Sequence, residues 1–257
     1  MFTVFLTYRE LLLELTMREI RQRYKQSVLG YAWVILNPFF QMLVMSFVFS
    51  FLLRVADLGV PYAIFLYAGL LPWTLFANST NSSVNALVGN AGLLTKIYFP
   101  REVFVMSTIL AKVVDFFLAS SIFVLMMAWF RIPITWHILW FVPIFLIQML
   151  FTYGFSLFVS AMNLFYRDIQ YVLGLLLMVW MYLTPVIYPT EMFPERFRFI
   201  FQLNPMAVFV NAYRQVILGG GEPNYASLAI GLILSIVLTL LGYRFFKKRE
   251  GEFADVV

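Results

Sequence analysis

The hydrophobic pattern of the chain consists of long uncharged stretches separated by short segments that carry most of the charges. A helix that crosses a hydrocarbon core about 30 Å thick needs about 20 apolar residues. Six stretches meet this requirement and predict six transmembrane helices. The stretch 132–166 counts once, because it is too short for two spans with a turn and suits one long or tilted helix. The predicted spans are 33–53, 62–87, 103–130, 137–165, 169–190 and 225–243.

The segment 1–30, before the first span, predicts an amphipathic helix on the cytoplasmic side that lies in the plane of the lipid headgroups. Its charged residues recur every three or four positions, which places them on one face of a helix, while leucines occupy another face. The residues of the charged face are Glu10, Glu14, Arg18, Arg21 and Lys25. The alternative is a passive anchor without a moving role.

Two segments outside the spans also predict short helices. Residues 191–222, between the fifth and sixth spans, are apolar but broken by prolines, and predict helices at 193–203 and 205–218 that dip into the membrane. Backbone at that depth must be covered by protein or line a cavity. The segment 93–99 is long enough for two helical turns, which Pro100 would end. The alternatives are a surface-lying loop for the first segment and an ordinary interfacial turn for the second.

Composition narrows the class of protein. Of the 257 residues, 62% are hydrophobic and 12% are charged, whereas a soluble domain averages about half apolar and a quarter charged. These values exclude an ordinary water-soluble enzyme and a disordered chain, and predict an all-α integral membrane protein with a single domain, 1–257. Because the chain has no cysteine and one histidine, no disulfide, thiol nucleophile or metal site is expected.

The distribution of basic residues predicts the orientation. With an even number of spans both termini lie on one side, and 12 of the 18 Lys and Arg residues fall on that side. Five fall on the other side, and Lys112 lies within a span. The positive-inside rule therefore places both termini in the cytoplasm. The net charge of +5 reflects this bias of the loops, and no nucleic-acid partner is expected.

Catalytic motifs are missing from the sequence. It contains no phosphate-binding loop (GxxxxGK followed by Ser or Thr), no HExxH and no GxSxG, so this chain is expected to be no enzyme and to hydrolyse no ATP. Within the spans, Lys112 and Asp115 are the strongly ionisable residues, and their spacing places them together on one helix. We interpret them as a structural ion pair. The alternative is a site that couples transport to protons or ions.

Aromatic residues are unusually frequent, with 29 Phe, 14 Tyr and 6 Trp. Many suit the aromatic belts at the two membrane interfaces, but others lie in mid-span. Aromatic rings stack on the C–H faces of sugars and leave the hydroxyl groups to water, so a channel lined by them suits a long hydroxylated chain. The alternative is bulk that faces lipid. The channel-lining candidates are Phe39, Phe40, Phe47, Trp180 and Tyr182.

Four stretches of the chain, in order, resemble a known family. They are LTMREIRQRYKQSVLGYAWVILNPFFQMLVMSFVF (15–49), GNAGLLTKIYFPREV (89–103), NLFYRDIQYVLGLLLMVWMYLTPVIYP (163–189) and LNPMAVFVNAYRQVIL (203–218). Together they resemble the membrane subunits of polysaccharide-exporting ABC transporters of the second type, which are the permeases for O-antigen, capsule and teichoic acid. Each motif is loose alone, but four in order on a six-span layout are specific.

The resemblance implies an assembly and a substrate. The permease would be a homodimer that pairs with two copies of a separate ATPase subunit. That subunit would bind ATP and Mg, and this chain would hold no cofactor. The substrate would be an undecaprenyl-linked glycan made in the cytoplasm, with O-antigen as the leading interpretation. The chain would be a multi-pass protein of the bacterial inner membrane, in contact with membrane lipid.

The resemblance also implies roles for particular residues. Spans one and five would line a channel at the dimer interface, and the helices between spans five and six would form its external gate. The residues expected to dock on the ATPase are Leu93, Lys96, Ile97, Tyr98, Arg101, Glu102, Arg167 and Asp168. The expected gate residues are Phe197, Phe201, Asn204, Pro205, Tyr213 and Arg214.

Three alternatives stay open. An ion- or proton-coupled secondary carrier would need Lys112 and Asp115 to titrate and would need no ATPase. A membrane-embedded enzyme of lipid-linked sugar chemistry would need clustered carboxylates or histidines in a loop, and that pattern is not seen in the sequence. Export of another glycan, such as teichoic acid or capsule, would keep the exporter and change only its substrate.

Overall fold

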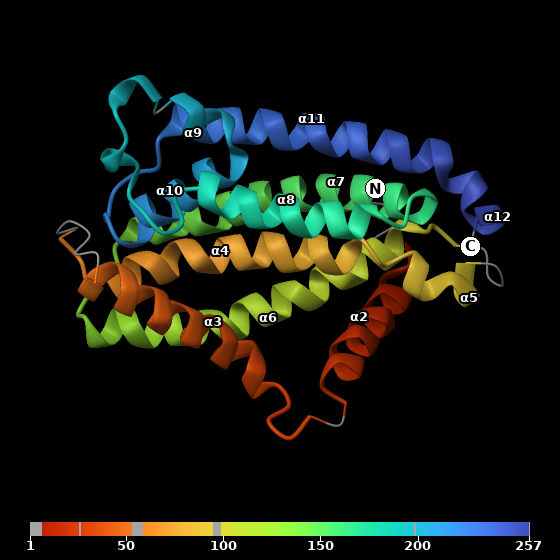
Figure 1. Ribbon diagram of the computed structural model, residues 1–257, viewed down its shortest axis with the longest axis horizontal. Helices are drawn as coiled ribbons and strands as arrows, with labels where there is room; N and C mark the ends of the chain where they lie inside the picture. The colour runs from red at the N-terminus through yellow and green to blue at the C-terminus, as the bar shows by residue number, and fades with distance from the viewer. Residues whose placement is uncertain (1–6, 26, 53–58, 95–98, 198, 257) are drawn as a thin grey trace.

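The computed structural model describes residues 7–25, 27–52, 59–94, 99–197 and 199–256, and the regular structure in these ranges is helical (Figure 1). The α-helices are α2 (Arg9–Tyr24), α3 (Ala32–Ser46), α4 (Tyr62–Ser83), α5 (Ala91–Leu94), α6 (Glu102–Trp129), α7 (Phe141–Phe165), α8 (Ile169–Leu183), α9 (Phe199–Leu203), α10 (Pro205–Ile217), α11 (Tyr225–Arg249) and α12 (Phe253–Val256). The shorter helices are the π-helical η1 (Phe47–Leu52) and the 3-10 helices η2 (Val88–Asn90), η3 (Trp136–Trp140), η4 (Thr190–Met192), η5 (Glu195–Phe197) and η6 (Glu250–Glu252).

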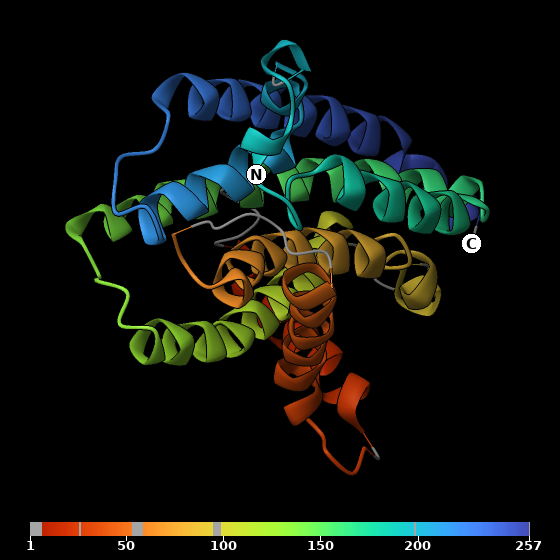
Figure 2. The same cartoon turned by 60° about the vertical axis from the view of Figure 1, so that its left-hand side comes forward.

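The long helices run roughly along one axis, so the molecule has two ends (Figure 1). One end carries the first turn of α2 together with α5 and α12, and we call it the α12 end. The opposite end carries α9, α10 and the first turn of α11, and we call it the α10 end. In the second view, α2 and α3 project away from the rest of the bundle (Figure 2).

Four of the six predicted spans form helices that are long and apolar enough to cross a membrane: Ala32–Ser50, Glu102–Trp129, Trp136–Phe165 and Tyr225–Glu252. The other two stretches are helical but differ in character. α4 ends in a run rich in Asn and Ser, and α8, with 15 residues, is about 22 Å long, shorter than a hydrocarbon core. The all-α class is therefore confirmed, and the full set of six spans stays a prediction.

Several helices end at other residues than the sequence predicts. α8 ends at Leu183 rather than at 190, because Thr184 precedes Pro185 and takes an extended conformation. α4 ends at Ser83 rather than at 87, and α11 continues to Arg249 rather than ending at 243. In the segment 191–222, α9 starts later than predicted, whereas α10 covers almost the whole of its predicted range.

α4 is the central helix, since it packs against α3, α6, α7, α8 and α10 and most of its residues are buried. α7 and α11 form a close pair because small residues let the two backbones approach. A Cβ added at Gly242 would lie 2.2 Å from the carbonyl oxygen of Gly154. The Thr239 hydroxyl donates across the same contact to the Leu150 carbonyl at 2.7 Å. These helices form a scaffold that connects the two ends.

In contrast, α3 and α8 are apolar helices that lie mostly exposed. Their buried residues are Val34 and Met42 in α3 and Leu173 and Leu177 in α8. The exposed apolar residues include Phe40, Leu43, Val44, Tyr171, Val172, Leu175, Leu176, Met178 and Val179. Apolar patches of this extent mark a surface that meets lipid or protein.

The amphipathic segment forms α2, a helix within the predicted range 1–30. α2 packs against α6, and Leu12, Leu15 and Ile20 on its inner face are buried. Part of the apolar face that was expected to rest in the headgroup plane is therefore covered by the chain itself. Its charged residues Glu10 and Glu14 stay exposed.

Candidate functional site

A buried arginine organises the α10 end. Arg214 of α10 is 7% exposed, and its guanidinium donates hydrogen bonds to three backbone carbonyl groups. Nε donates to Phe65 at 3.1 Å, Nη2 to Val186 at 2.6 Å, and Nη1 to Pro185. The guanidinium carbon also lies 3.6 Å from the centre of the Phe65 ring, within reach of a cation–π interaction. One side chain thus ties α10 both to α4 and to the segment that follows α8.

A glycine of α4 makes room for this arginine. A Cβ added at Gly69 would lie 2.5 Å from Arg214 Nη2 and 3.2 Å from the Val186 carbonyl oxygen. Both distances are shorter than ordinary van der Waals contact. The guanidinium and its carbonyl acceptors therefore occupy the volume that a side chain at position 69 would need.

Asn204 makes a second set of connections at the α10 end. Its side-chain oxygen accepts hydrogen bonds from two backbone N–H groups of the first turn of α10, at 3.1 and 3.4 Å. Pro205 follows as the first helical residue, where its missing N–H costs nothing. The same oxygen accepts from Trp180 Nε1 at 2.9 Å, and the amide nitrogen donates to the Thr184 hydroxyl at 3.0 Å. The start of α10 is therefore attached to the end of α8.

Tyr213 and Phe201 complete this end. Tyr213 is buried and donates through its hydroxyl to Gln148 Oε1 of α7 at 3.0 Å. The Phe201 ring packs edge-on against Phe193, with ring centres 5.1 Å apart. The structure thus brings together at the α10 end the residues that the resemblance assigns to an external gate. The exception is Phe197, whose side chain lies outside the described part.

The channel-lining candidates fall into two groups. Three of them are more than half exposed: Phe40, Phe47 and Tyr182. Phe39 is half-buried against the core. Trp180 instead points into the chain, where its ring lies 5.2 Å from that of Phe76 in an edge-on arrangement and its N–H serves the cap of α10. Trp180 therefore positions α10, whereas Phe40, Phe47 and Tyr182 lie mostly at the surface of the chain.

At the α12 end, two residues expected to dock on the ATPase have partners within the chain. Glu102, the first residue of α6, is 1% exposed and accepts a hydrogen bond from Lys247 Nζ at 2.6 Å. Lys247 also donates to Glu250 Oε2 at 2.9 Å, and Glu250 Oε1 accepts from the backbone N–H of Arg101 at 3.0 Å. We call Glu102, Lys247 and Glu250 the C-terminal ion cluster, and it joins the start of α6 to the end of α11.

The sequence reasoning missed the role of this C-terminal segment. Phe253 in α12 is fully buried against Phe246, with ring centres 5.1 Å apart, and Phe165 of α7 lies next to it. The guanidinium of Arg101 lies 5.9 Å from the Phe253 ring centre. The available signal was the mixed basic and acidic run that follows the last span, with one aromatic residue after it.

The remaining residues expected to dock on the ATPase are placed differently. Leu93 lies in the short α5 and is half-buried, while Arg167 and Asp168 are exposed in the turn between α7 and α8. Lys96, Ile97 and Tyr98 lie outside the described residues. Among the described residues expected to dock on the ATPase, Arg167 and Asp168 are therefore exposed and accessible to a partner.

Lys112 and Asp115 lie together on α6, with Lys112 Nζ 3.7 Å from Asp115 Oδ2. A closer partner is Arg23, near the end of α2, which binds the same carboxylate oxygen. The three residues border a cavity of about 370 Å³ between α2, α3, α4 and α6, which the amides of Asn37 and Asn78 also line. The pair inferred from spacing is thus a triad that attaches α2 to the bundle.

These arrangements connect helices rather than assemble a reaction centre. Within the described ranges, no group of three or more His, Cys, Asp or Glu side chains could hold a metal ion. The buried polar groups instead link backbone segments that lie far apart in the chain, as Arg214 and Glu102 do. Such links join helices that are separated in the sequence.

Comparison with known proteins identifies the family. The family model described as "ABC-2 type transporter" matches residues 10–218. The chain is 34% identical over 252 residues to an "O-antigen export system permease protein RfbA" of Klebsiella pneumoniae, covering 96% of this chain and 95% of that protein. It is 33% identical to the RfbA protein of Myxococcus xanthus, over 97% of this chain and 96% of that one.

A more distant relative is the "Polysialic acid transport protein KpsM" of Escherichia coli, which is 25% identical over 92% of both chains. The family model covers most of the chain, and the RfbA relatives match it nearly from end to end. This protein belongs to the ABC-2 type transporter family of membrane permeases.

Proposed function

We propose that this chain is the transmembrane subunit of an ATP-driven exporter that moves a lipid-linked polysaccharide out of the cytoplasm across the bacterial inner membrane. The observation that carries the proposal is the 34% identity to an O-antigen export permease over nearly the full length of both chains. O-antigen is the foremost substrate, because the polysialic acid transporter matches at only 25% identity. The lipid carrier expected for such a glycan is undecaprenyl phosphate or diphosphate.

The proposed assembly is a homodimer with two copies of an ATPase subunit, which binds ATP and Mg. The exposed apolar faces of α3 and α8 support it, since both faces need cover by lipid or by a second copy. In this arrangement Phe40, Phe47 and Tyr182 line a path between the two permease copies, where their rings make weak, repeated contacts with sugars. Trp180 does not line this path but packs inside the chain and holds the start of α10 in place.

The proposed topology has six spans, formed by α3 with η1, α4, α6, α7, α8 and α11. Both termini lie in the cytoplasm, as the positive-inside rule predicts. The α12 end then faces the ATPase and the α10 end faces outward, with α9 and α10 as the external gate. The opposite placement of these two ends along the bundle supports this assignment (Figure 1).

The proposed coupling begins at the α12 end, where α5, the turn at Arg167 and Asp168 and the first turn of α2 meet the ATPase. Displacement of α2 is passed to α6 through Arg23 and Asp115. Displacement of α8 must carry α10 with it, because Asn204 and Arg214 attach α10 to the end of α8 and to the residues after it. The gate therefore moves as one body with α8.

The test is export in a strain that lacks the permease. The chain is expressed together with its ATPase subunit, and O-antigen on the cell surface is detected by gel analysis and antibody binding. Surface O-antigen should appear only when both subunits are present and the ATPase can hydrolyse ATP. Export that continues with a hydrolysis-dead ATPase would favour an ion-coupled carrier, and restoration of capsule instead of O-antigen would reassign the substrate.

A further inference from the structure

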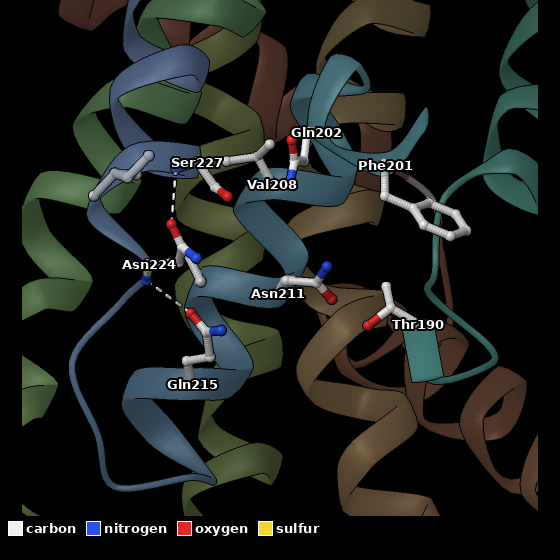
Figure 3. Close-up of a pocket in the computed structure, with 10 residues that line it drawn as sticks. Thr190, Phe201, Gln202, Val208, Asn211, Gln215, Asn224 and Ser227 are labelled. Atoms are coloured by element: carbon white, nitrogen blue, oxygen red, sulfur yellow. Dashed lines mark hydrogen bonds between the residues drawn. The ribbon is translucent and has the colours of Figure 1, made fainter. Parts of the chain in front are cut away.

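We infer that the pocket between α9, α10 and α11 is a binding site for one neutral sugar ring of the exported glycan (Figure 3). The inference rests on the proposed function and adds a subsite to it. The pocket lies at the α10 end and has a volume of about 180 Å³, room for roughly six water molecules of about 30 Å³ each. A single pyranose ring fits a space of this size.

The lining of the pocket indicates the chemistry of its ligand. The polar residues that surround it carry amide or hydroxyl groups: Thr190, Gln202, Asn211, Gln215, Asn224 and Ser227. These groups both donate and accept hydrogen bonds, as sugar hydroxyls do. Among the described residues that line it, none is charged, so neither a phosphate nor a cation is favoured. Apolar side chains, Val208 among them, supply surface for the C–H groups of a ring.

Part of this lining is held in place by hydrogen bonds within the chain. Gln215 Oε1 accepts from the backbone N–H of Asn224 at 3.0 Å, and Asn224 Oδ1 accepts from that of Ser227 at 3.0 Å, as Figure 3 shows. These bonds fix the start of α11 against α10. They do not involve Asn211, whose amide also lines the pocket.

Asn211 is the residue best placed to bind a ligand. Its side chain is half-buried, and its amide lines the pocket and makes no hydrogen bond to the described part of the chain. In Figure 3 the amide projects from α10 into the space between Gln202 and Thr190. A sugar hydroxyl would satisfy both its donor and its acceptor. Three residues further along α10, Arg214 fixes the same helix to α4, so the amide is held on a rigid support.

A site of this kind suits a glycan that must be released soon after it binds. A neutral ring held by a few amides is bound weakly, and weak sites in series allow a long polymer to enter and leave. Because α9 and α10 of the proposed gate line the pocket, it would hold one ring while the next segment of glycan advances. The ligand class is a hexopyranose, within the glycan or as a free glycoside.

The first experiment measures saturation transfer by NMR from the permease–ATPase complex in nanodiscs to methyl glucoside, methyl galactoside and methyl mannoside. At least one neutral glycoside should receive transfer, and methyl glucuronide should receive less. Asn211→Leu, which keeps the branched shape and the number of heavy atoms of the side chain, should weaken binding about tenfold, the effect of losing one or two hydrogen bonds. The matched control is Asn81→Leu, an exposed amide on α4 away from the pocket. No transfer to any neutral glycoside, or equal transfer in both variants, overturns the inference.

The second experiment separates this inference from the proposed function. The native chain has no cysteine, so N211C introduces a single thiol that a membrane-impermeant maleimide can report in cells. Labelling should occur from outside and should fall severalfold while the exporter carries glycan, whereas R131C, at an exposed position in the turn after α6 that the proposed topology also places outside, should be labelled without such protection. Unchanged labelling at N211C in cells that still display O-antigen would overturn the pocket assignment and leave the exporter intact. Loss of O-antigen display with the unaltered permease would count against the exporter itself.

Discussion

The two ends of the molecule bury charge in different ways. At the α10 end, the charge of the Arg214 guanidinium is stabilised by hydrogen bonds to backbone carbonyl groups of two segments and by the face of an aromatic ring. At the α12 end, the buried carboxylate of Glu102 is paired with Lys247, which lies on the last turn of α11 and is shared with Glu250. One end is held by backbone geometry and the other by pairs of ionised side chains.

This difference indicates which end keeps its contacts when salt or a partner's charge changes, and which end alters them. Backbone acceptors do not titrate, and hydrogen bonds to them change little with salt. Ion pairs near a surface are screened by salt and are altered by any charge that a partner brings. We therefore expect the proposed gate at the α10 end to move as a unit, and the α12 end to adjust when the proposed ATPase partner changes state.

The largest loss of stability is expected at Arg214. Arg214→Met removes three hydrogen bonds from a charged donor to backbone carbonyl groups, and such bonds contribute about 1.5–3 kcal/mol each, so the free energy of unfolding should fall by at least about 4.5 kcal/mol. Arg214→Lys should recover only part of this, because an ammonium group cannot reproduce the fork of donors. Thermal unfolding of the purified permease in detergent measures both variants.

The matched control for Arg214 is Arg131→Met, at an exposed arginine. This variant should change the unfolding temperature little. If Arg214→Met were no less stable than Arg131→Met, the α10 end would not depend on the carbonyl cluster. Hydrogen bonds to backbone carbonyl groups would then not distinguish the α10 end from the α12 end.

The next largest effect is expected in the C-terminal ion cluster. Lys247→Met leaves Glu102 buried without its cation, which should cost about 3 kcal/mol. Adding Glu102→Gln to that variant should restore most of the loss, because no uncompensated charge remains. A double-mutant cycle from unfolding temperatures measures the coupling. Arg249→Met, which removes the exposed pair with Glu252, serves as the control and should cost less than about 1 kcal/mol.

Additive losses in this cycle would show that Glu102 and Lys247 act independently, in conflict with the structure. A loss for Arg249→Met as large as that for Lys247→Met would mean that charge at the end of α11, rather than burial of Glu102, determines stability. Either result would mean that the buried ion pair of Glu102 and Lys247 does not hold the α12 end together.

The sequence predicted elements better than contacts. The limits of α10 were close to correct because Asn204 and Pro205 are local signals for the start of a helix and the glycines after it are signals for its end. The short length of α8 was missed. Its apolar run continues past Pro185, and hydrophobicity alone does not show where the helix breaks.

The partners of the charged residues could not be read from spacing. Asp115 was paired with Lys112 because they are three apart, but Arg23, from a separate helix, binds the same oxygen. The acceptors of Arg214 are backbone carbonyl groups, which leave no trace in the residue types. Trp180 was grouped with the exposed aromatic residues because α8 is apolar on all sides, so periodicity could not tell its inner face from its outer one.

A smaller loss is expected from crowding the α10 end without removing a donor. Gly69→Ala places a methyl group 2.5 Å from Arg214 Nη2, and the guanidinium cannot retreat without breaking hydrogen bonds to carbonyl groups. Overpacking of this kind should cost about 2 kcal/mol. The control is Gly174→Ala in α8, where no atom lies within 4 Å of the added carbon and helix propensity favours alanine by about 1 kcal/mol.

Unfolding temperatures of the two glycine variants should therefore move in opposite directions. If Gly69→Ala were as stable as Gly174→Ala, the space beside Arg214 would be adaptable, and the α10 end would be less rigid than the geometry indicates. Combining Gly69→Ala with Arg214→Met should cost less than the sum of the two changes, because the clash disappears with the guanidinium.

The smallest effect on stability is expected at the turn between α7 and α8. Arg167 and Asp168 are exposed, so reversing both charges with Arg167→Glu and Asp168→Lys should change the free energy of unfolding by less than about 0.5 kcal/mol. The same variant should lose most of its association with the ATPase subunit, because a short turn offers few other contacts to a partner. Co-purification of the two subunits, with ATPase activity measured on the complex, tests this effect.

The double reversal is most informative beside a charge reversal at another exposed residue of the α12 end. Arg249→Glu lies on the exposed side of α11 and should leave ATPase association near that of the unaltered permease. If the double reversal at Arg167 and Asp168 keeps both complex formation and export, the turn is not a docking site. The pairing of the ATPase with the permease would then depend on α5 and the first turn of α2, at the same end of the molecule (Figure 1).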